Sequence, residues 1–535
     1  MWLVASVTIA AMPTRAAAQD DLLRGADAPA GSDEEEYRRV LQISGRAKWY
    51  PWSIRAFSPR EIDRMLCPDT SSAVVACRSR PGALRTASLR AAMVLNSNFP
   101  YGANDGPVWA GRGLTGSATP AMTFQLGALS ARIAPTVFWT TNGKFPLLAN
   151  DEPGSMAFND GQFPLTVDRP QRFGNGAYGR IDPGNSFVRL DTRFVTVGLS
   201  TANMIWGPAV EQAFVLGNNA PGFPHAFLGT GEPVNIFLGR LHTRFVWGLL
   251  SQSNYSPVTG SSRWISASEP GRDRLMAGMI AVFAPRGMSG LEVGISRFTH
   301  LAFPAGGVPR GFWRAPFGRL FFTDYDMEAP ASNEQASIFA RWAHVRSGFE
   351  VYGEYGREDH ASGFRELVQD PEHQRSYMLG FQKTLGGTAS AINVLRGEVF
   401  SFLLPPNARD RVEGPIYTHT QLRQGHTHHG QLLGGSAGVG NAAAATLAWD
   451  RYSRRTKTTV RWRRVVRAQR GDYFLTGVED PRSSDVLNSA GVRYSRSHGP
   501  LISSFAAEYA YNLNRNFEGD AGNLNLRYDV RWLIR

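Results

Sequence analysis

The sequence predicts an all-β protein, a transmembrane antiparallel β-barrel of about 16–18 strands with a small α-helical region before it. Three observations lead to this prediction. Apolar and polar residues alternate along many segments, which is the two-residue period of a strand with one apolar and one polar face. Short polar links alternate with long connections. Beyond the N-terminus there is no run of about 18 apolar residues, the length that a membrane-spanning helix needs.

Residues 1–18 have the pattern of a secretory signal peptide. An apolar segment from Trp2 to Met12 is followed by Ala16-Ala17-Ala18, an A-x-A cleavage site, directly before Gln19. Residues 19–36 are acidic and small, and we expect a flexible lead. A cleaved signal predicts export, with mature protein beginning near Gln19.

Residues 37–87 are expected to form a small helical region that ends in a disulfide loop. Ser58 precedes Pro59, and proline is favoured at the first position of a helix. The two cysteines of the chain, Cys67 and Cys77, flank a loop-like stretch. An exported protein enters an oxidising space, so we expect these cysteines to form a local disulfide, with reduced cysteines as the alternative.

Residues 88–535 are predicted to form the barrel. The final strand shows the pattern most clearly, because its apolar set is Leu524, Leu526, Tyr528, Val530, Trp532 and Ile534. Its polar set is Asn525, Arg527, Asp529 and Arg531. In a membrane barrel the apolar face meets lipid and the polar face lines the lumen.

The polar faces of the other strands predict a lumen with many charges. The candidates are Arg189, Asp191, Arg193, Arg240, His242, Arg244, Glu350, Glu354, Arg396, Glu398, Arg461, Arg463, Arg493, Arg527, Asp529 and Arg531. The structural interpretation is that these arginines and carboxylates pair across neighbouring strands. The functional interpretation is that the arginine excess binds an acidic glycan, because a guanidinium holds a carboxylate through two hydrogen bonds.

The net charge of +12 has two explanations. Most of the basic residues are arginines, as a GC-rich genome would also produce. The functional explanation is a positive surface that attracts an anionic polymer. Nucleic acid is excluded as a partner by the predicted export and by the lack of a nucleic-acid-binding motif.

The stretch 186–250 carries a resemblance to a known family. It contains Trp206-Gly207-Pro208, then Asn218-Asn219-Ala220-Pro221, then Leu238-Gly239-Arg240-Leu241. With the order of signal peptide, short helical region and long barrel, it resembles the Wzi-type capsule assembly proteins. The resemblance implies an outer-membrane barrel, a helical region on the periplasmic side, and a lectin-like, noncatalytic role in retaining capsular polysaccharide at the cell surface.

The expected contacts to such a polysaccharide combine amides, an aromatic ring and guanidinium groups. Asparagine amides can donate to and accept from sugar hydroxyls. The alternative is that the tryptophan packs and the asparagines close turns. The candidate binding residues are Trp206, Asn218, Asn219, Arg189, Arg193, Arg240 and Arg244.

Two other functions stay open at this point. One is a diffusion porin or polysaccharide-export pore. The other is a hydrolase that uses Ser436, which lies in a G-x-S-x-G pattern, with His419 or His426 as its base. His426, His428 and His429 could bind a metal, but we expect them to be solvated in an external loop. The sequence therefore predicts no metal site and no cofactor, and its expected partners are an acidic surface polysaccharide and outer-membrane lipid.

Overall fold

The computed structural model describes residues 28–66, 84–258, 273–304, 307–317, 332–358, 364–388, 391–404, 414–469 and 483–534. The predicted signal peptide, the first half of the predicted acidic lead (residues 19–27), and both Cys67 and Cys77 lie outside the described residues.

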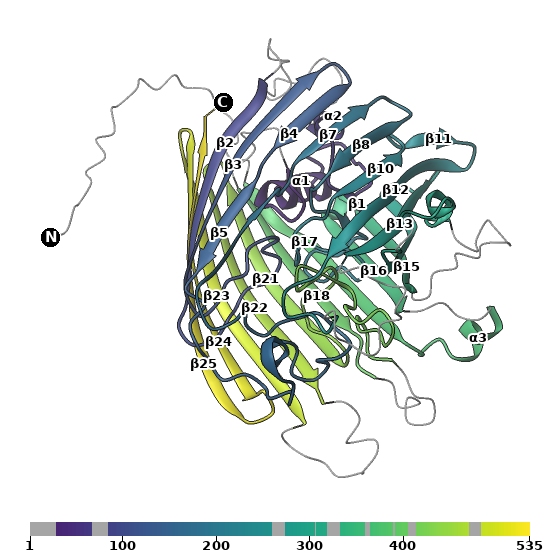
Figure 1. The fold of residues 1–535 in the computed structure, drawn as a ribbon. Helices are drawn as coiled ribbons and strands as arrows, with labels where there is room; N and C mark the ends of the chain where they lie inside the picture. The colour runs from purple at the N-terminus through teal and green to yellow at the C-terminus, as the bar shows by residue number, and fades with distance from the viewer. Residues whose placement is uncertain are drawn as a thin grey trace.

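The chain forms a closed antiparallel barrel (Figure 1). Its strands are β2 (Leu84–Asn96), β3 (Gly113–Leu126), β4 (Leu129–Ile133), β5 (Thr136–Thr140), β6 (Tyr178–Asp182), β7 (Phe187–Asp191), β8 (Thr196–Ser200), β10 (His225–Gly229), β11 (Val234–Ile236), β12 (Gly239–Ser251), β13 (Asp273–Pro285), β14 (Leu291–Ala302), β15 (Ser332–His344), β16 (Phe349–Glu358), β17 (Arg375–Thr388), β18 (Ala391–Ser401), β21 (Ala442–Ser453), β22 (Thr456–Ala468), β23 (Ser484–His498), β24 (Leu501–Arg515) and β25 (Gly519–Leu533).

Some of these segments are halves of one interrupted strand. β4 and β5 both pair with β3, β6 and β7 continue one another beside them, and β10 and β11 both pair with β12. Counted this way, the described residues form a barrel of 18 strands. The last strand closes the barrel on the first, with Leu89 opposite Trp532. The predicted fold class is confirmed.

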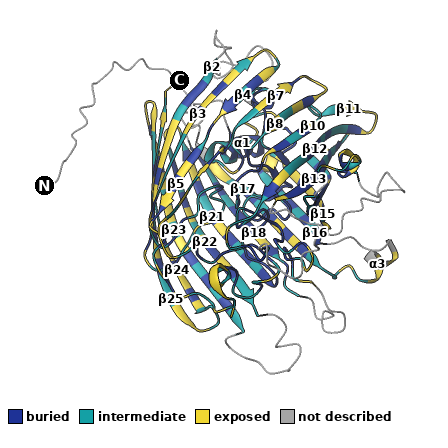
Figure 2. Cartoon of the chain, in the orientation of Figure 1, coloured by how far each residue is buried: buried dark blue, intermediate teal, exposed yellow. Residues whose placement is uncertain are grey.

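Buried and exposed residues alternate along the barrel strands, as the sequence predicts (Figure 2). On β25, Leu524, Tyr528 and Trp532 are exposed on the outer face, whereas Asn525 and Asp529 are buried. An exposed apolar exterior with buried charges is the arrangement that a lipid bilayer requires. Among the described residues, no helix is long and apolar enough to cross a membrane.

The two ends of the barrel differ. One end carries short turns, at 127–128, 192–195, 237–238, 286–290, 345–348, 454–455 and 499–500. The other end carries long connections, among them 97–112, 141–177, 201–224 and 402–441. In bacterial outer-membrane barrels the short turns face the periplasm and the long loops face outward.

Two helices, α1 (Asp33–Ile43) and α2 (Pro59–Leu66), lie inside the barrel near the short turns (Figure 1). Each begins with a Ser-x-x-Glu pattern in which the backbone N–H of the glutamate donates to the serine Oγ, at 3.2 Å for Glu35 to Ser32 and 3.0 Å for Glu61 to Ser58. The start of α1 corrects a predicted boundary, because the last four residues of the expected flexible lead are helical. β2 likewise starts at Leu84, before the predicted barrel boundary.

The remaining elements are short. They are β1 (Ile54–Arg55), which pairs with β9 (Ile205–Trp206), β19 (Thr427–His428), which pairs with β20 (Gln431–Leu432), α3 (Phe364–Gln369), and the 3-10 turns Gly154–Phe158, Phe312–Arg314 and Val345–Ser347.

A packed apolar core fills the middle of the lumen. Inward side chains of the strands, such as Val246, Ile280 and Phe339, pack with residues of the long connections, such as Phe214 and Tyr417. The connection 201–224 and the described residues 414–441 of the β18–β21 connection therefore fold into the barrel. This placement is why His426 and His428 are buried, which corrects the prediction that they are solvated.

The alternation yields a test at Trp462, in the middle of β22, whose side chain is 41% exposed on the outer face. We expect Trp462→Arg to cost about 2–4 kcal/mol of folding free energy near the bilayer midplane. Trp462→Phe is the control and should have a small effect. Folding yield into lipid vesicles, followed by the heat-dependent gel shift of the barrel, measures both. Equal yields of the two variants would show that Trp462 does not face lipid.

Candidate functional site

A cavity of about 400 Å³ with a basic strand wall, here called the basic cavity, lies inside the barrel, beside α1. Its lining includes nine Lys and Arg side chains from the barrel strands but only two carboxylates from those strands, Glu508 and Asp529. Charges in a partly dehydrated lumen need counterions, because desolvation makes an unpaired ion costly. The strand wall therefore cannot neutralise its own charge.

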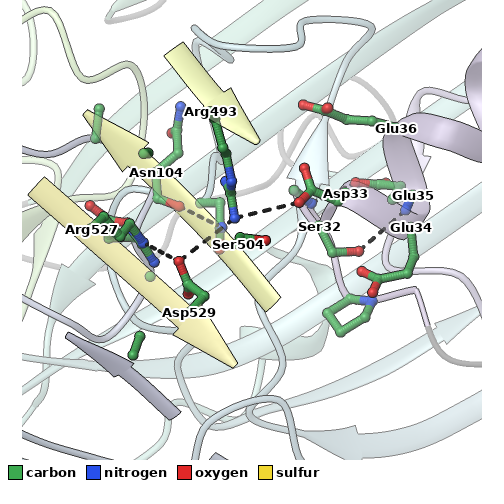
Figure 3. A pocket seen from close by; sticks show the side chains of 18 of the residues that line it. Ser32, Asp33, Glu34, Glu35, Glu36, Asn104, Arg493, Ser504, Arg527 and Asp529 are labelled. Atoms are coloured by element: carbon green, nitrogen blue, oxygen red, sulfur yellow. Dashed lines mark hydrogen bonds and ion pairs between the residues drawn. The ribbon is translucent and has the colours of Figure 1, made fainter. Parts of the chain in front are cut away.

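The first turn of α1 supplies much of the missing negative charge (Figure 3). Asp33 accepts a hydrogen bond from Lys457 Nζ at 2.7 Å and lies 3.4 Å from Arg493. Glu36 accepts from the same Lys457 Nζ at 2.8 Å. Glu34 forms an ion pair with Arg531. Acidic side chains also interact favourably with the positive end of a helix dipole, so both the ion pairs with the strands and the dipole stabilise this turn.

Connections supply further counterions. Arg527 pairs with Asp105 of the β2–β3 connection and with Asp529 of its own strand, while Arg396 contacts Glu211 at 3.1 Å and Asp450 at 2.8 Å. The expected pairing across strands thus accounts for only part of the charge. The Ser32-x-x-Glu35 capping box was the sequence signal that could have identified the acidic turn as a helix start.

The predicted residues Arg189 and Arg244 are buried near the short turns rather than lining this cavity. Their guanidinium carbons lie 5.1 and 4.9 Å from the centre of the Phe227 ring. Arg189 also donates to Asp191, with Nε 2.9 Å from Oδ2. Both side chains are held by neighbours within the protein, but by a carboxylate of the same strand and an aromatic ring rather than by carboxylates across strands.

Arg193 and Arg240 have different surroundings. Arg193 is exposed in the turn between β7 and β8, so it does not face the lumen, because the alternation of β7 ends at Asp191. Arg240 is half-buried, with its guanidinium 5.0 Å from the ring centre of Trp49.

Trp206 has no exposed surface. Its indole packs so closely on Gly278 of β13 that a Cβ there would meet Trp206 Cη2 at 2.7 Å. Gly207 follows with φ +90°, a backbone conformation that favours glycine and allows the predicted tight turn. A side chain in this position stabilises the core and leaves no ring face for a sugar, which corrects its placement among the ligand contacts.

The two asparagines stand at turns of the β8–β10 connection. Asn218 donates to the carbonyl oxygen of Asn104 at 2.9 Å and accepts from the Asn203 amide at 2.8 Å, although it lines the basic cavity. Asn219 makes a longer contact of 3.4 Å with the carbonyl oxygen of Leu432. Asn218 alone among the seven predicted binding residues reaches the cavity.

Ser436 lies in a turn with no helix after it, unlike a nucleophile elbow. Its hydroxyl oxygen accepts hydrogen bonds from Gln212 Nε2 at 3.0 Å and from Arg463 Nη2 at 2.7 Å. Neither partner can serve as a general base.

His426 is buried against the Tyr417 ring, with Nε2 2.6 Å from the carbonyl oxygen of Val215, and burial lowers its pKa to about 3. In the described part of the chain, no three His, Cys, Asp or Glu side chains are grouped to hold a metal.

A second cavity, of about 240 Å³, opens at the end with the long connections. We call it the rim cleft and define it by Phe99, Phe145, Asp160, Arg169, Arg467, Asp485, Arg515, Asn516 and Phe517. The sequence interpretation missed it, because its residues come from parts of the chain that are far apart in sequence.

A family model described as "Capsule assembly protein Wzi" matches residues 98–498. The chain belongs to the Wzi family of capsule assembly proteins. The predicted resemblance, drawn from a short stretch, is therefore confirmed over most of the chain.

The solved structure of Escherichia coli Wzi supports the fold. The structure of Escherichia coli Wzi, described as a carbohydrate-binding β-barrel of the outer membrane involved in group 1 capsule assembly, has a TM-score of 0.63 at 13% identity and covers 94% of this chain and 99% of its own. Acinetobacter baumannii OccAB2 has a TM-score of 0.41 at 10% identity, covering 84% of this chain and 98% of its own. Comparison with curated proteins finds no match.

The ion pairs of α1 predict the effect of removing Lys457, whose side chain is only 5% exposed. We expect Lys457→Met to lower the free energy of unfolding by about 1–3 kcal/mol, because Asp33 and Glu36 lose their shared cation. Arg454→Ala, in an exposed turn, should change it by less than about 0.5 kcal/mol. Guanidinium unfolding followed by tryptophan fluorescence measures both, and equal midpoints would contradict the assigned pairing.

Glu61 at the start of α2 predicts a pH dependence. Burial by itself raises the pKa of Glu61. The hydrogen bond with His242 and the positive charge of Arg244 have a larger, opposite effect, so the pKa falls to about 2. Its stabilising effect is therefore present above its ordinary value of 4.5 and is lost as pH falls toward 2. We expect Glu61→Gln to remove up to about 3 kcal/mol at pH 7 and progressively less below pH 4.5. Unfolding curves at both pH values test this, and a pH-independent difference would contradict it.

Proposed function

We propose that this chain is a noncatalytic outer-membrane protein that binds and retains an acidic capsular or other surface polysaccharide during capsule assembly. Family membership supports the role in capsule assembly, and the carbohydrate binding described for the Escherichia coli protein supports the ligand class. The excess of basic residues supports an anionic polymer.

The single observation that carries the proposal is the filled lumen. Apolar side chains from the wall and from two long connections pack together across the middle of the barrel, and α1 and α2 occupy the end with the short turns. A diffusion porin keeps a polar, water-filled channel. The packed core therefore favours a binding barrel over a porin or export pore.

A hydrolytic function has weaker support. Ser436 has an amide and a guanidinium as its hydrogen-bond donors, and its backbone forms a turn rather than a strand–helix elbow. His426, a proposed base, is directed at a backbone carbonyl. These contacts support a structural role for Ser436 and a noncatalytic protein.

Two measurements test the proposal together. In planar bilayers we expect the purified protein to show no stable open-channel conductance. In a strain that makes the polysaccharide but lacks the gene for this protein, we expect a reintroduced copy to restore surface-bound acidic polysaccharide. Retention should weaken in high salt, because the Debye length falls from about 10 Å at 0.1 M to about 3 Å at 1 M.

Dextran, a neutral polymer, is the matched control and should bind weakly at every salt concentration. Steady conductance together with no retention would overturn the proposal in favour of a pore.

A further inference from the structure

The rim cleft contains three guanidinium groups, and two of them are already paired. Arg169 Nη2 lies 2.6 Å from Asp160, and Arg467 Nη2 lies 3.1 Å from Asp485. Both carboxylates are buried, with side chains 1% and 3% exposed. Each also accepts backbone N–H groups, from Phe163 at 2.8 Å and from Asn516 at 3.0 Å. The negative charge of each carboxylate is therefore already largely balanced and cannot fully neutralise a third cation.

Arg515, at the end of β24, is the third. Its guanidinium carbon lies 4.2 Å from the ring centre of Phe99 and 5.7 Å from that of Phe145. Within the described ranges, Arg515 forms no ion pair and its side chain donates no hydrogen bond. The two rings restrict where the guanidinium can lie, and a guanidinium offers N–H groups in a planar arrangement that matches a carboxylate.

The volume and the lining of the cleft suit one sugar unit. Its volume of about 240 Å³ is below the roughly 300–1,000 Å³ typical of sites for drug-sized ligands. Phe517, in the turn between β24 and β25, keeps part of its ring exposed. An exposed aromatic ring can bury the apolar face of a sugar. A carboxylate on that sugar would then be within the reach of Arg515.

We propose that the rim cleft is a subsite for one uronic acid residue of the polysaccharide, with Arg515 binding the carboxylate and Phe517 packing on the sugar ring. This inference rests on the proposed function and names the chemical group that the site selects. The cleft opens at the end with the long connections, where an outer-membrane barrel faces the cell exterior. A polymer outside the cell can therefore reach it without entering the lumen.

Calorimetric titration of the full-length barrel in detergent tests the subsite. The probes are an oligomer of glucuronic acid and a glucose oligomer of the same linkage and length. We expect the wild-type protein to bind the acidic oligomer and to discriminate against the neutral one. Arg515→Ala should weaken binding of the acidic oligomer at least about tenfold, because a charge-assisted, bidentate hydrogen bond to the carboxylate is lost. Phe517→Ala should weaken binding as well.

Two further variants keep the test decisive. Arg454→Ala removes the same charge from an exposed turn at the opposite end of the barrel and should leave affinity unchanged. Arg515→Lys keeps the positive charge but not the planar guanidinium, so its affinity should lie between those of wild type and Arg515→Ala. This variant also tests the subsite if Arg515→Ala does not assemble. If wild type binds and the Arg515 variants bind equally well, the subsite is wrong and the proposed function stands. If wild type binds no acidic oligomer and retains no polysaccharide, the proposed function fails as well.

Discussion

The inner wall beside α1 carries more positive charge than its own strands neutralise, and much of the remaining structure follows from that constraint. A cation facing a crowded lumen loses much of its hydration and needs a carboxylate nearby. The acidic first turn of α1 meets this need through Lys457, Arg493 and Arg531. The ion pairs fix where the helix lies and leave the basic cavity beside it.

The long connections enter the lumen under a similar constraint. A backbone segment buried inside a barrel must satisfy its N–H and C=O groups. Strand side chains do this here. Glu398 of β18 accepts from the backbone N–H groups of Val210, Glu211 and Gln212 at 2.7–3.0 Å, and Arg274 of β13 donates to the carbonyl oxygens of Gly425 and Thr427 at 2.5 and 2.6 Å. Inward charged residues, which by their type could bind a ligand, thus form hydrogen bonds with the protein's own backbone.

The sequence predicted the wall of the barrel far better than its contents. Alternation is local, so it gave the strand faces, the final strand and the number of strands. The partners of the inward charges come from distant parts of the chain and have no period. Arg189 and Arg244 face inward as predicted, and the alternation also places Asp191, the partner of Arg189, on the same face. It does not identify Phe227, whose ring lies close to both guanidinium groups. Asp33–Glu36 looked like a solvated acidic tail, and Trp206 looked like a sugar platform, because composition does not show burial. Arg515 has no distinctive neighbours in sequence, and only folding brings Phe99 and Phe145 around it.

The central claim is that the barrel works with its lumen filled, binding polysaccharide from its outer end. A covalent lock of α1 tests this most directly. The rings of Tyr37 on α1 and Tyr452 on β21 stack at 4.9 Å, so cysteines at these two positions can be joined by a short bismaleimide in a background where Cys67 and Cys77 are serine. The account predicts that cells with locked barrels retain as much acidic polysaccharide as cells with unlocked ones. Loss of retention on locking, restored when a cleavable linker is cut, would contradict the account, because it would mean that α1 must leave the lumen for the protein to act.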